Sequence, residues 1–230
     1  MRTVPRIVRS VVAAGVALVV AACAGEADDI VTTTTAPVRA AGAETPDEAV
    51  ASLTRALAVG RFVEAVDLTV NGQMLVVALA EGLDVDGALS LLEMGADDVG
   101  VNFWGGFAAS LEDFLGYEPD DIEIGTVSTF EVDDRRFARV DAFVPLDSSV
   151  RHFVVQEEDG WRIDVLATFA SALAGKLPDA ADLVRGHPEG APLLEVMRRH
   201  IPSLRAVIEG GDAQPQLVQA ALAAIERIQR

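Results

Sequence analysis

The single cysteine of the chain, Cys23, is its most nucleophilic side chain. A thiolate readily forms thioethers, and the small residues Ala21 and Ala22 leave the neighbouring backbone accessible to an enzyme. Because there is no second cysteine, the chain forms no internal disulfide and binds no metal through paired thiolates. The chemistry expected at Cys23 is therefore a covalent modification.

Asp141 and His152 are the other residues whose types suit chemistry. In an apolar cavity such an imidazole acts as a general base that the carboxylate orients, and Arg139 would hold an anionic group. The alternative is structural: Arg139 pairs with Asp141 or Glu131 across strands on a solvated face, and His152 is half exposed. Both interpretations place these residues on neighbouring β-strands.

Four segments have the period-two alternation that such strands require, namely residues 122–132, 136–144, 150–157 and 161–166. The turns between them are short, and the first is Asp133–Asp134. This spacing predicts a four-stranded antiparallel meander. Apolar residues at helical spacing precede and follow it, so the predicted fold class is α+β, with N-terminal helices packed on the meander and a C-terminal helical extension.

Symmetric pairing about these turns places Phe143 opposite His152, which makes Asp141 a diagonal neighbour of His152, and places Gln156 opposite Trp161. One face then carries Asp141 and His152 with the candidate ligand-binding residues, which are Arg139, Phe143, Gln156 and Trp161. The other face is rich in Ala and Val and is the more conventional core. A slip of one residue would exchange the two faces.

The residues before Cys23 have the order of a secretory signal. Arg2, Arg6 and Arg9 form a basic start without an acidic residue, and Val11 to Ala22 is apolar. As a helix this apolar run is about 18 Å long. That is too short for a transmembrane helix, which needs roughly 20 residues.

Val20, Ala21, Ala22 and Cys23 together resemble the lipobox of bacterial lipoprotein signal peptides. The resemblance implies cleavage between Ala22 and Cys23, a diacylglycerol on the Cys23 thiol and an acyl chain such as palmitate on the new amino terminus. The protein would then be anchored by lipid to the outer, extracytoplasmic face of the bacterial cell membrane. The alternatives are an ordinary signal peptide with an incidental cysteine and a single-span anchor.

The chain is strongly acidic, with a formal net charge of −18 over 230 residues. Loss of residues 1–22, which contain three arginines and no acidic residue, would change this charge to −21. Such a surface repels phosphate backbones, so nucleic acid is excluded as a partner. Solubility explains the acidity better than binding of calcium or a basic ligand, and the sequence contains no calcium-binding loop, metal site or cofactor motif.

Residues 23–44 lack apolar periodicity and predict a flexible tether. Thr45, Pro46 and Glu48 predict a capping box at the start of the folded domain, residues 45–170. Within this domain, residues 73–118 predict a helical insert, whose stripe of Phe103, Phe107, Leu111 and Phe114 is typical of a core. Residues 171–230 predict the helical extension, packed on the domain.

Residues 45–50 and 58–62 (TPDEAV and AVGRF) resemble the opening helix pair of nuclear transport factor 2-like, ketosteroid-isomerase-like domains, and residues 159–164 (DGWRID) resemble their last hairpin. The resemblance implies a cone-like fold with a cavity between helices and sheet. Members of this family include isomerases, dehydratases and non-catalytic binding proteins. The helical insert and the C-terminal extension depart from the usual pattern.

Three functions are compatible with these patterns. The first is a membrane-anchored lipoprotein whose acidic domain binds an envelope partner protein or an apolar small molecule, without catalysis. The second is a small-molecule isomerase, dehydratase or hydrolase that uses Asp141 and His152. The third is a structural lipoprotein that makes contact through its C-terminal helices.

Overall fold

The computed structural model describes residues 41–112, 118–144, 147–210 and 213–230. The expectations for Ala22, Cys23 and the tether up to residue 40 lie outside these residues, as does that for Phe114. None of the helices in the described ranges is long and apolar enough to cross a membrane.

Two helices open the domain at the predicted positions, α1 (Pro46–Ala58) and α2 (Phe62–Asp67). Thr45 caps α1 by accepting a hydrogen bond from the Glu48 N–H over 3.4 Å. The Glu48 carboxylate accepts from the Glu44 N–H over 3.1 Å, so the reciprocal bond of the box is made one residue earlier than predicted. Because its apolar residues recur at helical spacing, α1 presents one buried face, which includes Val50 and Leu53.

The predicted helical insert contains α3 (Gln73–Ala80), α4 (Val85–Met94) and α5 (Asp97–Ser110). Trp104 of α5 is fully buried, and its indole N–H donates to Thr69 Oγ1 over 3.1 Å. Trp104 also makes edge-to-face contacts with Phe103, Phe107 and Phe169, at centroid distances of 5.1, 5.7 and 6.0 Å. Of the predicted stripe, Leu111 is buried and Phe103 and Phe107 are partly buried against the main core, so the interpretation as core is confirmed in part.

The sheet follows a short 3-10 turn, η2 (Pro119–Asp121), and consists of β1 (Glu123–Val132), β2 (Arg135–Val144), β3 (Asp147–Glu157) and β4 (Trp161–Ile163). The strands are antiparallel in the order β1-β2-β3-β4, which confirms the α+β fold class and the meander. Asp133 and Asp134 have φ angles of 49° and 62°, the left-handed conformation that a two-residue hairpin turn requires.

The register of β2 against β3 differs by two residues from the prediction. Asp141 pairs with His152, and Phe143 pairs with Val150 instead of His152. The pairing shifts between Phe143 and Val144, so the loop is not symmetric as assumed. A shift of two residues leaves these side chains on their predicted faces. Asp141 and His152 are therefore direct cross-strand partners and not diagonal neighbours.

The predicted strand 161–166 is wrong in both length and register. β4 ends at Ile163 because Asp164 caps the helix that follows. Trp161 pairs with Glu157 and not with Gln156. This slip of one residue moves Trp161 and Ile163 to the Ala/Val-rich face, opposite to the predicted one.

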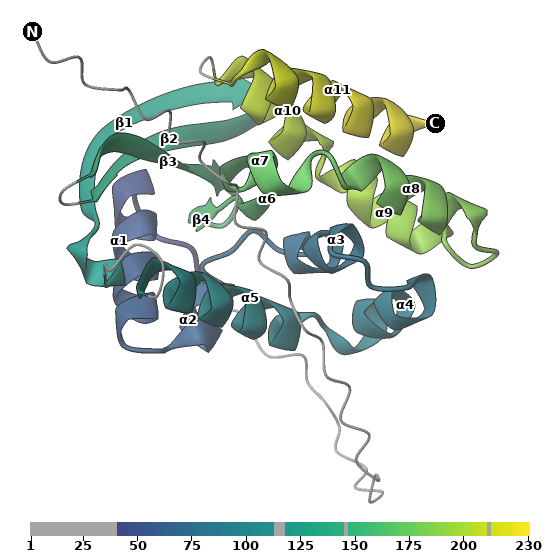
Figure 1. Cartoon of the computed structure of the whole chain (residues 1–230), viewed down its shortest axis with the longest axis horizontal. Coiled ribbons are helices and arrows are strands. Elements are labelled where there is room, and N and C mark those ends of the chain that lie inside the picture. Colours follow the sequence, from purple (N-terminus) through teal and green to yellow (C-terminus); the bar gives the residue numbers. More distant parts are fainter. Residues whose placement is uncertain (1–40, 113–117, 145–146, 211–212) are drawn as a thin grey trace, which may run out of the picture.

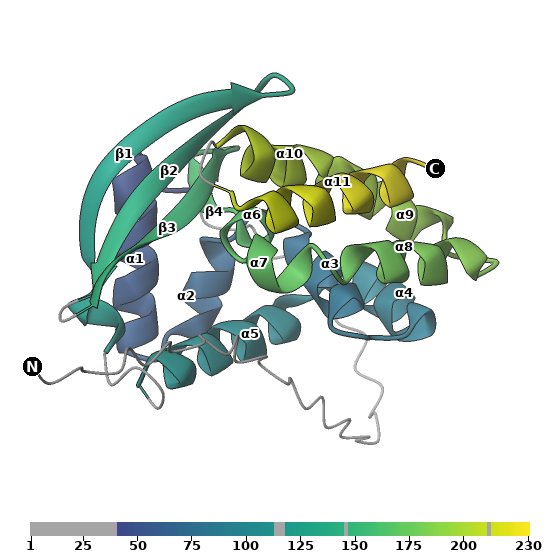
Figure 2. The ribbon, with the colours of Figure 1, turned by 45° about the horizontal axis from the view of Figure 1, so that its top comes forward.

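The Ala/Val-rich face of the sheet packs against α1. Ala138, Val140, Val155 and Ile163 are completely buried there, in the main hydrophobic core. Figure 1 and Figure 2 show the long strands curving around α1. The opposite face packs in part against α10, where Phe137 belongs to a smaller buried cluster.

Short and long helices complete the chain: α6 (Val165–Thr168), α7 (Ala170–Leu173), α8 (Leu177–Gly186), α9 (Ala191–Arg199), α10 (Ile201–Glu209) and α11 (Pro215–Gln229). α9 and α10 are separated by a break at His200, and Pro202 lies in the first turn of α10. The C-terminal helices share the main core with α1, as Ile225 and Ile228 of α11 belong to the same cluster as Val50.

A buried polar network joins α3 to the end of β4 and to α10. The Gln73 Nε2 donates to Asp164 Oδ1 over 2.9 Å and to Ser203 Oγ over 3.1 Å, and its Oε1 accepts from the Val165 N–H over 2.7 Å. Burial raises the pKa of Asp164 above its usual 3.8, against the opposing effect of hydrogen bonds that favour its charged form. The network holds α6 in place directly after the sheet.

His200 is a buried histidine, with 2% of its surface exposed. Neither ring nitrogen has a hydrogen-bond partner among the described residues. Burial, together with the positive charges of Arg135 and Arg199, lowers the pKa of His200 from 6.5 to about 3. His200 is therefore neutral in the folded protein at neutral and mildly acidic pH.

We expect His200→Leu to reduce the acid sensitivity of the fold. Below pH 6.5 the unfolded chain gains a proton at His200 that the folded protein does not accept until about pH 3. The contribution of His200 to the free energy of unfolding is fully present above pH 6.5. It decreases as the pH is lowered, by about 3 kcal/mol between pH 7 and pH 4. Urea unfolding at pH 7 and pH 4 should show that His200→Leu loses about 3 kcal/mol less unfolding free energy than the wild type. His187→Leu should lose as much as the wild type, and equal losses in all three proteins would contradict the assignment.

Candidate ligand-binding groove

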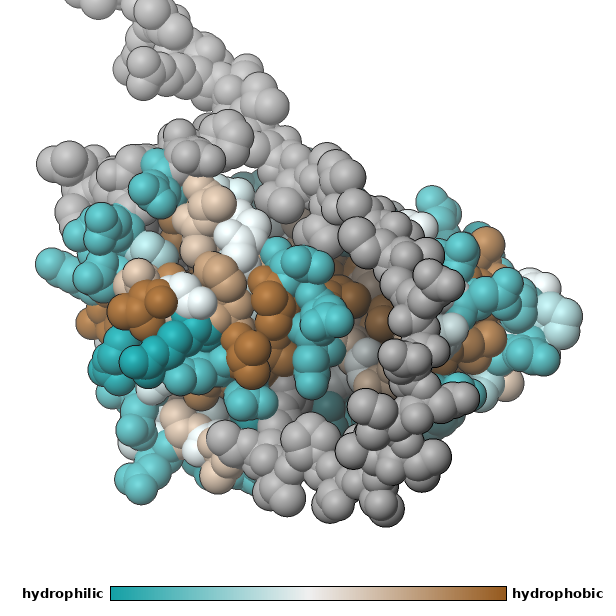
Figure 3. All heavy atoms as spheres, turned by 90° about the horizontal axis from the view of Figure 1, so that it is seen from below, coloured by the Kyte–Doolittle hydropathy of each residue, from teal (hydrophilic) through white to brown (hydrophobic). Residues whose placement is uncertain are grey.

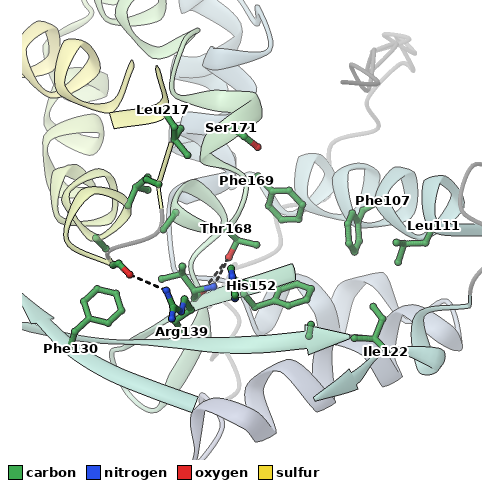
Figure 4. A pocket seen from close by; sticks show the side chains of 18 residues that line it. Phe107, Leu111, Ile122, Phe130, Arg139, His152, Thr168, Phe169, Ser171 and Leu217 are labelled. Atoms are coloured by element: carbon green, nitrogen blue, oxygen red, sulfur yellow. Dashed lines mark hydrogen bonds between the residues drawn. The ribbon is translucent and has the colours of Figure 1, made fainter. Parts of the chain in front are cut away.

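A cavity of about 550 Å³ lies beside β3, between the sheet and helices α5, α6, α7, α10 and α11. This cavity, the β3 groove, is partly open, and its volume is within the roughly 300–1,000 Å³ typical of small-molecule sites. Its walls are mainly aromatic and aliphatic (Figure 4), formed by Phe107, Leu111, Ile122, Phe130, Phe153, Val154, Phe169, Val207 and Leu217.

The shortness of β4 explains why the groove forms at this edge of β3. β4 pairs with β3 only from Val155 to Glu157, because Asp164 starts α6 immediately after β4. Thr168 of α6 then takes the place of a strand at Val154, as its Oγ1 accepts from the Val154 N–H over 2.9 Å and donates to the Val154 carbonyl over 3.2 Å. Before Val154, the described residues leave a cavity beside β3.

The structure brings Asp141 and His152 together, as the sequence predicted. They lie directly opposite each other and not diagonally. His152 Nδ1 lies 2.9 Å from Asp141 Oδ1, with side-chain exposures of 35% and 21%. Such close contact is typical of a directly opposed pair without backbone hydrogen bonds between its members. With the Nδ1 proton donated to the carboxylate, the Nε2 lone pair is available at the groove, which His152 lines.

Arg139 also lines the groove, and its guanidinium group already contacts other groups of the protein. Its Nη1 donates to the Gly210 carbonyl over 3.0 Å, and its Nε lies 4.0 Å from Asp141 Oδ1. The structural alternative from the sequence, an Arg139–Asp141 pair beside a half-exposed His152, therefore describes part of the same arrangement. Figure 4 shows Arg139, His152 and Thr168 together at the centre of the groove, with aromatic side chains on both sides.

The other candidate ligand-binding residues do not line the groove. Gln156 shares the face of His152 but is 98% buried, opposite Arg162 of β4. Phe143 lies near the end of the inner strand β2, paired with Glu123 and Val150, and is 38% exposed and close to Gly125. Trp161 lies on the opposite face, where the Arg136 guanidinium is 5.5 Å from the centre of its ring.

Several groove residues were not among the sequence-based candidates. Phe107 belongs to the predicted core stripe, Val207 and Leu217 belong to the predicted helical extension, and the sequence predicts no binding role for Thr168 or Phe169. The helical period identifies the apolar residues that share one face of a helix. It does not show which other element that face packs against. For these residues the sequence offered no stronger signal.

The face formed by α2, α4 and α5 is a weaker candidate for binding. Val59, Val63 and Met94 are 60%, 65% and 78% exposed. Where this face is visible, Figure 3 shows apolar atoms interrupted by hydrophilic ones.

Among the described residues, no three His, Cys, Asp or Glu side chains are placed to hold a metal ion. The β3 groove is therefore the better-formed site.

Comparisons with known proteins give no further guidance. The chain matches no family model, and neither a curated protein nor a solved structure matches it.

Proposed function

We propose that this protein is a bacterial cell-envelope lipoprotein that is anchored through Cys23 to the outer face of the cell membrane and binds a partner protein or an apolar ligand. The observation that carries the binding proposal is the β3 groove, with its aromatic walls and few polar groups. The lipobox resemblance at Cys23 supports the location. The proposed kinship with nuclear transport factor 2-like domains is compatible with the α1–α2 pair and the meander.

The aromatic residues of the groove give it a preference for apolar ligands. Phe107 and Phe169 contact each other edge to face at 5.3 Å, which leaves ring surfaces available to a ligand. The Thr168 hydroxyl is already hydrogen-bonded to the Val154 backbone. The Arg139 guanidinium already donates to the Gly210 carbonyl and lies 4.0 Å from the Asp141 carboxylate. A ligand therefore gains mainly from apolar contact, and polar groups select its orientation.

Binding can be tested with N-phenyl-1-naphthylamine, a neutral dye that becomes fluorescent in apolar sites. Ser171 is exposed and lines the groove, so Ser171→Trp fills the mouth without altering the core. We expect saturable binding to the wild type and at least tenfold weaker binding to Ser171→Trp, which is about 1.4 kcal/mol.

Ser90→Trp is the matched control, because Ser90 is an exposed helical serine outside the groove. This variant should bind the dye as the wild type does. Equal binding by all three proteins, or none by the wild type, would show that the groove does not bind apolar molecules.

A second candidate function is isomerase- or dehydratase-type catalysis, which the 2.9 Å contact between Asp141 and His152 favours. His152 would remove a proton through Nε2, and Asp141 would hold the ring and stabilise its charged form. This candidate can be tested with cyclohex-3-enone, whose isomerisation to the conjugated enone is followed by absorbance. We expect Asp141→Asn to be slower than the wild type by about 100-fold or more. Equal rates in the two proteins would exclude this role for the pair.

A further inference from the structure

We propose that the natural ligand of the β3 groove is an extended, cationic stretch of polypeptide that adds as a strand to the free edge of β3. This inference rests on the proposed function, since it takes the groove to be a binding site. It replaces a general apolar ligand by one with a defined backbone geometry.

The first half of β3 has an unused strand edge. β3 has 11 residues and β4 has three, and the two strands pair only at Val155, Gln156 and Glu157. In the described ranges, no strand pairs with the earlier residues of β3 on this side. An unpaired edge of this kind is a template for a further strand.

The hydrogen-bonding groups of this edge point into the groove. The Val154 N–H donates to Thr168 Oγ1, and the Val154 carbonyl accepts from the Asp164 N–H over 2.9 Å, so both groups of Val154 point away from β2. In a strand this direction repeats at every second residue. The N–H and C=O of His152 therefore point away from β2 as well, toward the groove that its side chain lines.

The groove extends around the edge to both faces of the sheet. His152 and Val154 line it from one face, and Phe153 lines it from the other. An added strand directs successive side chains to opposite faces, so it would place them alternately against these two walls. Both walls are largely apolar, which suits a peptide with apolar side chains at intervals.

The charge around the groove favours a cationic peptide. Exposed Glu112, Glu123 and Glu209 are sequence neighbours of the groove-lining Leu111, Ile122 and Gly210. The arginine that lines the groove, Arg139, already donates to the Gly210 carbonyl and lies 4.0 Å from Asp141. The whole chain carries a formal charge of −18, which attracts cations at long range. A second copy of this chain fits less well, because it is equally acidic and its own β3 edge lies between helices.

The probe is an acetylated eight-residue peptide with four central valines and two lysines at each end, so that valine meets both walls, and its counterpart with glutamate in place of lysine is the charge control. We expect the lysine peptide to displace N-phenyl-1-naphthylamine from the wild type and to slow hydrogen exchange of the His152 amide by about tenfold or more. The glutamate peptide should bind at least about tenfold more weakly.

Two variants test the backbone bond directly. His152→Ala removes the side chain and keeps the N–H, whereas His152→Pro also removes the N–H, at an edge position where proline is tolerated. His152→Ala should change peptide and dye affinities by similar factors. His152→Pro should weaken the peptide by a further factor of about ten relative to the dye.

The outcomes separate this inference from the proposed function. If the wild type does not bind the dye, the proposed function fails. If the dye binds but the lysine peptide leaves exchange at His152 unchanged, the groove takes small molecules and the strand-addition inference is overturned. Dimerisation that protects this amide without peptide would also overturn it, in favour of a second copy. Because exchange is measured on the wild type, the test stands even if His152→Pro does not fold.

Discussion

Replacing Cys23 with serine is expected to move the protein from the membrane fraction to the soluble fraction. A serine hydroxyl is not converted to the thioether, so the anchor would be lost. Each buried methylene contributes about 0.8 kcal/mol and two acyl chains are needed for stable anchoring, so loss of the lipid should release nearly all of the protein. Fractionation of cells that produce the full chain measures this change directly.

Mass spectrometry of the wild-type protein provides the control for this experiment. The mature amino terminus should be Cys23, with the mass of a diacylglycerol and an acyl chain attached. A Cys23→Ser protein that still partitions into membranes would contradict lipid anchoring. A wild-type protein that is cleaved, unmodified and soluble would instead indicate an ordinary signal peptide.

Replacing Trp104 with alanine is expected to lower the free energy of unfolding by about 3–5 kcal/mol. The Trp104 side chain is fully buried, and its removal leaves a cavity beneath three aromatic rings. It also leaves the Thr69 hydroxyl without the indole donor. Urea unfolding at neutral pH measures the loss.

Two control variants divide this effect into its causes. Trp104→Phe keeps an aromatic ring and removes the hydrogen bond to Thr69, so an intermediate loss is expected. Val63→Ala, at a residue that is 65% exposed, should change stability by less than about 0.5 kcal/mol. If Trp104→Ala cost as little as Val63→Ala, the aromatic cluster would not be a core. Because Phe107 and Phe169 contact Trp104 and line the groove, Trp104→Ala should also weaken dye binding.

The sequence predicted those parts of the fold that depend on local signals. The capping residue Thr45, the alternation in the strands and the turn at Asp133–Asp134 each act within a few residues. The α+β class and the strand order follow from these features alone. The faces of β2 and β3 were also predicted correctly, because an error of two residues preserves the side-chain period.

Other features depend on contacts that the local sequence does not encode. β4 is short because Asp164 is held by Gln73, a residue about 90 positions earlier in the chain, and this distant contact fixes the start of α6. The one-residue slip that moved Trp161 to the other face reflects the length of the hairpin loop, because Glu157 and not Gln156 pairs with Trp161. The groove itself is formed by α5, α6, α7, α10 and α11 around one strand edge, so its aromatic wall was visible in the sequence only as separate core stripes.

Crystallography with a brominated N-phenyl-1-naphthylamine tests whether the β3 groove is a ligand site. We expect an anomalous peak from the bromine inside the groove, within contact distance of Phe107, Phe169 or Val154. An empty groove at saturating dye, or a bromine peak only at another surface, would contradict it.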